Sequence, residues 1–201
     1  WSRTVILMGG HVGIDETGSF WYYDFRGKRS SVCAAISKFP HDELLAKFSE
    51  IFAQRSGQGS GDNQEILRYF HVRDRSDEEN RAIFGNLSGL VQGVVASKGR
   101  PIVLGNPQHW WLSCVMTVIR YVMESPEVKL GDTLNIHLGS RFIEVVGVPK
   151  EVDWLSYHKN LEQDLTRWVK KINAKNLDVK LICVRAVSSA LVTLADQAIG
   201  M

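Results

Sequence analysis

Two adjacent carboxylates, Asp15 and Glu16, stand near the N-terminus, where an alternating apolar stretch meets the turn residues Thr17 and Gly18. A carboxylate at the end of a central strand faces a crevice while its backbone stays rigid, and its hard oxygen atoms suit a metal ion. The same Asp-x-x-Gly spacing also occurs in ordinary turns, since Asp accepts backbone hydrogen bonds and Gly tolerates positive φ. Because consecutive strand side chains point to opposite faces, both acids serve one site only if the chain bends between them. A metal site therefore needs a partner elsewhere in the chain.

Two further residues are candidates for that partner. Asp196 lies in an apolar C-terminal segment rich in small residues, where an inward-facing acid is costly unless it is paired or bound to metal. An outward-facing Asp196 would explain the pattern as well. His71 ends the apolar segment 66–71, and it is either a core histidine with one satisfied nitrogen or a proton shuttle beside the acids. The residue pattern leaves both alternatives open.

The composition is that of an ordinary globular protein. The 201 residues, 44% hydrophobic and 23% charged, suffice for one sizeable core, so we expect a single domain over residues 1–201. A net charge of +2 permits a nucleic-acid partner without arguing for one. The three cysteines lie far apart in apolar contexts, which predicts buried thiols in a reducing, cytoplasmic compartment. No apolar run approaches the roughly 20 residues that cross a bilayer, and no Cys/His spacing indicates zinc.

Periodicity and turn residues predict an α/β chain in which strands and helices alternate. Three N-terminal strands joined by short turns predict an antiparallel meander, and the alternating second half predicts parallel strands with right-handed crossovers. A capping box formed by Ser76 and Glu79 is expected to begin a helix. The expected strands are 4–15, 18–25, 30–37, 66–71, 100–105, 132–138 and 178–185, and the expected helices are 40–54, 76–96, 107–124, 152–173 and 188–200. We therefore expect a mixed sheet with helices on both faces.

The segment 152–173 is the clearest amphipathic helix of the sequence. Its expected apolar face includes Trp154, Leu155 and His158 in the first turns. Four cations lie mainly off that stripe, namely Lys159, Arg167, Lys170 and Lys171. Such cations are typical of a solvated helix face, and a nucleic-acid footprint is the alternative interpretation.

Two motifs resemble those of a known family. The stretch Ile-Asp-Glu-Thr-Gly at 14–18 resembles the Asp-Glu-Ser-Gly signature of the bacterial "domain of unknown function 3800" family, which is assigned to the ribonuclease H-like superfamily. The stretch 193–200 is similar to that family's closing Gln-Leu-Ala-Asp helix, with Thr193 where Gln is usual. His71 matches the family's middle motif, although Tyr69 stands at its acidic position. The first motif is also similar to the start of type 2 ribonuclease H.

This resemblance implies a ribonuclease H-like fold and a metal-dependent nuclease or phosphodiesterase that cleaves RNA or DNA. Such sites hold two Mg²⁺ or Mn²⁺ ions, which activate a water and steady the leaving oxygen of a phosphodiester. Mapped by position, Asp15 would bridge the ions and Glu16 would be a ligand or a base. Asp196 would close the site from the last helix, and His71 would assist as a proton shuttle or substrate contact.

The sequence departs from the family pattern on an inner strand. Ribonuclease H-like nucleases usually carry another acid there, whereas the segment 133–139 offers only Asn135 and His137, and Asp132 stands at the wrong end. A site with fewer carboxylates binds divalent metal more weakly. The alternative function is therefore a catalytically inactive ribonuclease H-like module that binds nucleic acid or a protein partner.

Overall fold

The computed structural model of the chain describes residues 10–17, 30–57, 61–71, 76–98, 107–126, 128, 130–140, 153–185 and 188–199. Within these residues, five strands form one mixed sheet in the order β3-β2-β1-β4-β5. The central strand β1 Gly10–Thr17 pairs antiparallel with β2 Ser31–Ser37 and parallel with β4 Thr133–Gly139. The strand β3 Val91–Lys98 extends the antiparallel side, and β5 Asp178–Val184 extends the parallel side. The expected mixed sheet is confirmed, while the predicted strands 18–25 and 100–105 lie outside the described residues.

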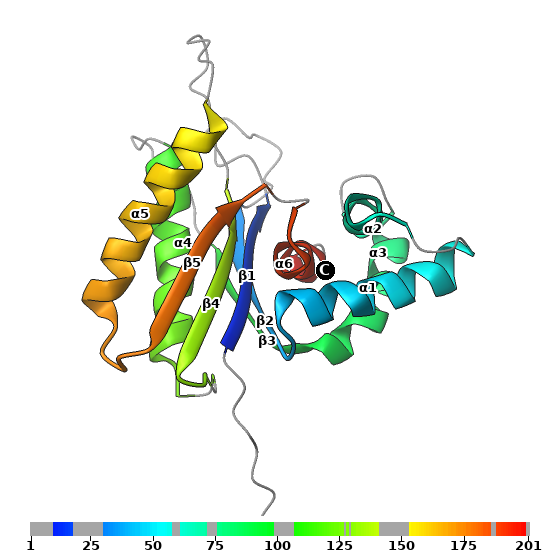
Figure 1. Cartoon of the computed structure of the whole chain (residues 1–201), viewed down its shortest axis with the longest axis horizontal. Coiled ribbons are helices and arrows are strands. Elements are labelled where there is room, and N and C mark those ends of the chain that lie inside the picture. Colours follow the sequence, from blue (N-terminus) through cyan, green and yellow to red (C-terminus); the bar gives the residue numbers. More distant parts are fainter. Residues whose placement is uncertain are drawn as a thin grey trace, which may run out of the picture.

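Helices cover both faces of this sheet (Figure 1). On one face pack α4 Pro107–Glu124 and α5 Trp154–Ile172. On the other face lies α6 Ala190–Ile199, with α1 His41–Ser56, α2 Asn63–Tyr69 and α3 Asp77–Leu87 around it. Two apolar clusters fill the layers, one on each side of the sheet. None of the helices in the described ranges is long and apolar enough to cross a membrane.

The central strand β1 divides its side chains between the two apolar clusters, as alternation along a strand requires. Val12 and Ile14 belong to the cluster beneath α4 and α5. Gly13 and Asp15 face the side of α6, where a Cβ on Gly13 would lie 1.7 Å from the carbonyl oxygen of Leu191. The missing side chain lets the α6 backbone lie directly on β1. This contact fixes the position of the α6 side chains relative to Asp15.

The structure corrects the strand that was predicted over residues 66–71. Most of this segment lies in helix α2, whose N-cap residue Asp62 accepts a hydrogen bond from the Glu65 amide at 2.8 Å. Ile66 and Phe70 are buried four positions apart, one helical turn, so the apolar run covers a helix face. A short apolar run does not distinguish a strand from a buried helix by periodicity alone, which explains the wrong prediction.

A second correction concerns the helix that was predicted over residues 76–96. The helix α3 ends at Leu87, and a 3-10 turn over Ser88–Leu90 leads into β3. The sequence of β3 contains the β-branched residues Val91, Val94 and Val95, which favour a strand. Its pairing with β2 therefore makes it the third antiparallel strand of the described sheet.

The capping box that was predicted at Ser76 is confirmed. Ser76 Oγ accepts a hydrogen bond from the Glu79 amide at 3.3 Å, and Glu79 Oε2 accepts one from the Ser76 amide at 3.0 Å. We expect Ser76→Ala to lower the free energy of unfolding by about 1 kcal/mol, because such a cap contributes roughly that amount. Thermal unfolding followed by circular dichroism measures the change. Ser113→Ala, at an exposed position inside α4, is the control that keeps its Tm, and an unchanged Tm for Ser76→Ala would contradict the prediction.

Candidate functional site

The acid predicted at the end of the first strand is buried near the carboxyl end of β1. Asp15 is 5% exposed and is paired with Cys33 on β2. On its other side lies Gly139, the last residue of β4, where a Cβ would stand 2.9 Å from Asp15 Oδ1. The lack of a side chain at Gly139 therefore provides the space that the Asp15 carboxylate needs.

The surroundings of Asp15 disfavour its negative charge. Burial, followed by the charges of Glu16 and Asp196, raises the pKa of Asp15 well above its ordinary value. Burial and the charge of Asp15 together raise the pKa of the Cys33 thiol to about 12. A buried carboxylate with like charges beside it is costly unless a proton or another cation neutralises it. Groups perturbed in this way gather at functional sites more often than elsewhere.

The last helix and the short segment that follows α2 bring Asp196 and His71 to the same place. The Asp196 side chain is 14% exposed, and its Oδ2 lies 2.9 Å from His71 Nδ1. Next to this pair, the side-chain amide of Gln197, the residue after Asp196, donates a hydrogen bond to the carbonyl oxygen of Phe70, the residue before His71. These neighbouring contacts hold His71 against Asp196. Of the two orientations that the sequence left open, Asp196 has the inward one.

Glu16 reaches the same edge of the sheet from the side of α5. Its charge raises the pKa of Asp15, and it also contributes, after burial, to the rise of the Tyr157 pKa to about 12. Glu16 is half-buried, between these two groups. The structure thus brings Asp15, Asp196 and His71 together and places Glu16 beside them, although the strand alternates in the expected way.

The donor set of this site consists of carboxylate oxygens, which are hard ligands suited to Mg²⁺ or Mn²⁺. Among the residues that the structure describes, no group of three or more His, Cys, Asp or Glu side chains is arranged to hold a metal ion. Mg²⁺ is commonly held by one or two carboxylates together with water and substrate phosphates rather than by a closed protein cage. The buried, mutually repelling acids Asp15 and Asp196 therefore fit an open site of this kind, and not a closed structural metal site.

The inner strand β4 contributes no acid to this group. His137 lies farther back along the strand, where its Nδ1 is 2.7 Å from Ser189 Oγ, and burial lowers its pKa to about 4. Asn135 lies two residues farther back, and Asp132 precedes the first residue of the strand. Because Ile14 pairs with Leu138, the residue of β4 beside Asp15 is Gly139. The inner-strand acid that the sequence lacks is thus also missing beside Asp15 in the structure.

The first turn of α5 differs from the prediction that it belongs to the apolar core face. Trp154 is 37% exposed and Leu155 is 81% exposed. The helix extends past the end of the sheet, so its first turn has no strand beneath it (Figure 1). Helical periodicity identified these residues as apolar, but it carries no information on where the sheet ends.

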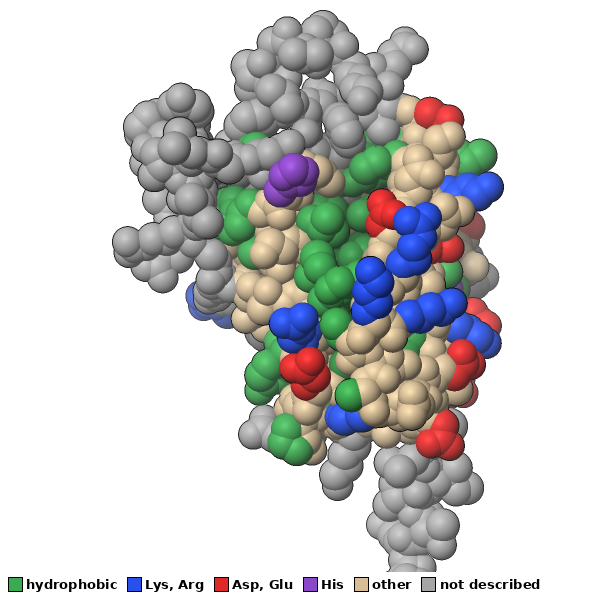
Figure 2. All heavy atoms as spheres, turned by 90° about the vertical axis from the view of Figure 1, so that its left-hand side faces the viewer, with side chains coloured by type: hydrophobic (Ala, Val, Ile, Leu, Met, Phe, Trp, Pro, Cys, Tyr) green, Lys and Arg blue, Asp and Glu red, His purple; other side chains and the backbone are tan. Residues whose placement is uncertain are grey.

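The cations of α5 lie on the outer face of the helix, where blue and red side chains are interspersed (Figure 2). Arg167 Nη1 lies 3.1 Å from Asp164 Oδ1, and both side chains are 70% exposed. Lys159, Lys170 and Lys171 are also exposed. The mixture of signs favours the solvated helix face over the nucleic-acid footprint.

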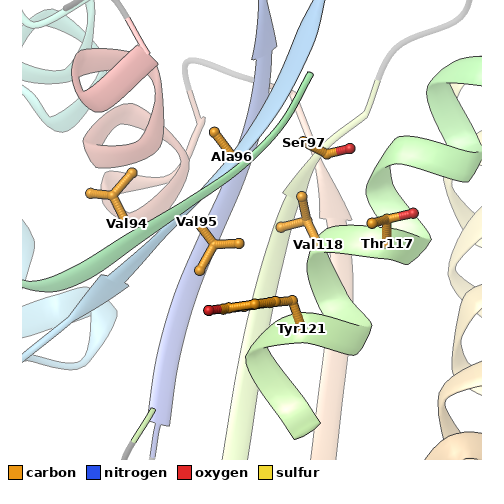
Figure 3. A pocket seen from close by; sticks show the side chains of 7 residues that line it. All are labelled: Val94, Val95, Ala96, Ser97, Thr117, Val118 and Tyr121. Carbon is orange, nitrogen blue, oxygen red and sulfur yellow. The ribbon is translucent and has the colours of Figure 1, made fainter. Parts of the chain in front are cut away.

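An open pocket of about 530 Å³ lies at the other side of the sheet, between β3 and α4 (Figure 3). Val95 and Tyr121 point toward each other across it, and its polar groups are the hydroxyls of Ser97, Thr117 and Tyr121. None of the lining residues that the structure describes is an acid, a histidine or a cysteine. The acids of the candidate site therefore lie outside this pocket, and we assign it no chemistry.

The sheet order, the mixed pairing and the helices on both faces define a ribonuclease H-like α/β fold. The chain is similar to a chain of the PCNA:RNase HII complex from Archaeoglobus fulgidus, with a TM-score of 0.50 and 10% identity over 94% of this chain and 69% of that chain. Ribonuclease H2 from Pyrococcus horikoshii OT3 gives a TM-score of 0.46 and 13% identity over the same shares of the two chains. No protein-family model matches the sequence, and no curated protein matches it. At this identity the likeness shows the fold alone.

Proposed function

We propose that this protein is a metal-dependent nuclease that cleaves phosphodiester bonds of RNA or DNA in the cytoplasm. The observation that carries the proposal is the buried Asp15 at the end of the central strand, whose charge is opposed by Glu16 and Asp196. His71 beside Asp196 adds a group that can accept and release a proton. The motifs at 14–18 and 193–200 support membership of the "domain of unknown function 3800" family. The three cysteines are free and buried, in keeping with a reducing compartment.

The proposed roles follow from the positions of the side chains. Asp15 and Asp196, whose charges act on each other, would hold Mg²⁺ or Mn²⁺, and Glu16 would supply a further oxygen from the side of α5. When bound, the ion supplies Lewis-acid stabilisation of the phosphodiester. His71 would hold a proton at the nitrogen that faces Asp196, and its side chain, 24% exposed, is accessible to a substrate.

Calorimetric titration with Mn²⁺ tests the metal site directly. We expect saturable binding by the unmodified protein and a loss of affinity of about tenfold or more in Asp15→Asn and in Asp196→Asn. Each substitution replaces a negatively charged carboxylate ligand of the ion by a neutral amide. Asp164→Asn is the matched control, since Asp164 is an exposed acid of α5 whose partner is Arg167. Absence of binding at millimolar metal, with all four proteins folded by circular dichroism, would overturn the proposal.

One observation favours a second candidate, a catalytically inactive module that binds nucleic acid or a protein partner. The residue of β4 beside Asp15 is Gly139, so the inner strand supplies no acid to the site. Incubation of labelled RNA and DNA with the protein and Mn²⁺ separates the two functions. Cleavage that is abolished by Asp15→Asn supports the nuclease. Binding of RNA or DNA without cleavage of either in the presence of Mn²⁺ supports the module.

A further inference from the structure

Three aromatic rings form a cluster at the start of α5, outside the acids described above. The ring centroids of Trp154 and His158 are 5.6 Å apart, those of Trp154 and Tyr157 are 5.9 Å apart, and those of Tyr157 and His158 are 6.0 Å apart. Trp154 meets both neighbours at steep angles, 69° to His158 and 88° to Tyr157. Edge-to-face contacts of this kind hold aromatic side chains in fixed orientations. Trp154 is therefore an exposed ring on a rigid support.

The cluster is connected to the candidate site through the end of β4. The hydroxyl of Ser140 is hydrogen-bonded to His158 Nε2, and Ser140 directly follows Gly139, which borders the Asp15 carboxylate. On the other side, the Gln108 side-chain amide donates a hydrogen bond to the Tyr157 hydroxyl at 2.7 Å. The start of α5 and the tip of β1 also lie at the same end of the molecule, at the top of Figure 1. The rings therefore lie at the same end of the sheet as the acids, on the face that Glu16 reaches.

Charges of both signs lie around the cluster, and a cation lies close to His158. Arg185, an exposed residue after β5, is close enough for its charge, together with burial, to lower the pKa of His158. Two acids are also near: Asp153 accepts hydrogen bonds from the Leu155 and Ser156 amides as the N-cap of α5, and the charge of Glu162 acts on His158 in the sense opposite to that of Arg185. A cation beside an exposed aromatic ring is a combination that suits single-stranded nucleic acid.

We propose that Trp154, supported by Tyr157 and His158, stacks against an unpaired nucleobase, so that the protein takes single-stranded nucleic acid at the edge where the acids lie. Every base has a face that can stack on an aromatic ring, so the contact tolerates any sequence. In a duplex the bases already stack on one another, so a ring of this kind has no free face to bind. The inference rests on the proposed nuclease function and names its substrate class.

Fluorescence anisotropy with short labelled oligothymidylate and oligouridylate tests this inference, in EDTA so that no cleavage occurs. We expect Trp154→Ala to weaken binding about tenfold, because stacking on one aromatic ring contributes roughly 1–3 kcal/mol per base. Trp154→Phe is expected to retain most of the affinity. Leu155→Ala is the matched control, because Leu155 is the adjacent, 81% exposed apolar residue and has no ring. A labelled duplex is expected to bind less tightly and to be insensitive to Trp154→Ala.

The outcomes separate this inference from the proposed function. Equal affinities for Trp154→Ala and the unmodified protein, or an equal loss in Leu155→Ala, would overturn the stacking site. Loss of affinity in Trp154→Ala without any Mn²⁺ binding at Asp15 would support the stacking site and overturn the nuclease. Mn²⁺ binding with no affinity for either oligonucleotide would overturn the stacking site and leave the metal site in place.

Discussion

Gly13→Ala is expected to destabilise the protein severely, with a loss of roughly 3 kcal/mol or more in the free energy of unfolding. An alanine Cβ at this position would lie 1.7 Å from the carbonyl oxygen of Leu191 and 2.1 Å from its carbonyl carbon. Both atoms belong to the backbone, so no side-chain rotation relieves the overlap. The whole of α6 would have to move away from β1, and the apolar contacts beneath it would open.

Thermal unfolding measures this effect, and Gly85→Ala provides the matched control. A Cβ on Gly85, inside α3, meets nothing within 4 Å, so the same substitution there is expected to keep or raise the Tm through higher helix propensity. For a chain of this size, a loss of 3 kcal/mol corresponds to a fall in Tm of about 10 °C. A Tm of Gly13→Ala within a degree of the unmodified protein would show that α6 does not lie against β1 as described.

Most helices and strands could be predicted from local patterns. The helix at Pro107–Glu124 was predicted with the same bounds, because a proline at its start and apolar residues at helical spacing define it. The wrong predictions fell on 66–71 and on 91–96, where short apolar or β-branched runs fit either structure. In both cases the outcome depends on a partner that is distant in sequence: Gln197 donates a hydrogen bond to Phe70 after α2, and β2 pairs with β3.

The candidate site could be predicted residue by residue, but its arrangement could not. Asp15 and Asp196 stood out because each is an acid in an apolar stretch, and this required only the sequence. Their approach depends on α6 lying on β1 at Gly13, a contact between residues about 180 positions apart that no local pattern contains. The role of Gly139 likewise depends on the register in which Ile14 pairs with Leu138. Tertiary packing, not local propensity, assembles the site.

Asp15→Asn is expected to make the metal-free protein more stable and, under the proposed function, to abolish cleavage. The substitution keeps the shape of the side chain but removes a buried charge that Glu16 and Asp196 repel. The raised pKa means that Asp15 keeps its proton to higher pH in the folded state than in the unfolded chain, where the pKa of the carboxyl group has its ordinary value of 3.8. The stability from Asp15 is therefore complete below about pH 4 and lost as the pH rises through the folded pKa.

The pH dependence of the difference in Tm between Asp15→Asn and the unmodified protein tests this sign, since titrations common to both proteins, such as that of His137, largely cancel. In EDTA we expect the difference to be small near pH 4 and to grow in favour of Asp15→Asn toward neutral pH, by roughly 3 °C for each kcal/mol. Addition of Mn²⁺ is expected to reverse the order, because an ion that binds only the folded, unmodified protein raises its stability. A difference that stays constant with pH would show that the Asp15 charge is not opposed in the folded state. If Mn²⁺ raises the Tm of the unmodified protein and of Asp164→Asn equally, but leaves the Tm of Asp15→Asn unchanged, the buried charge of Asp15 belongs to the metal site.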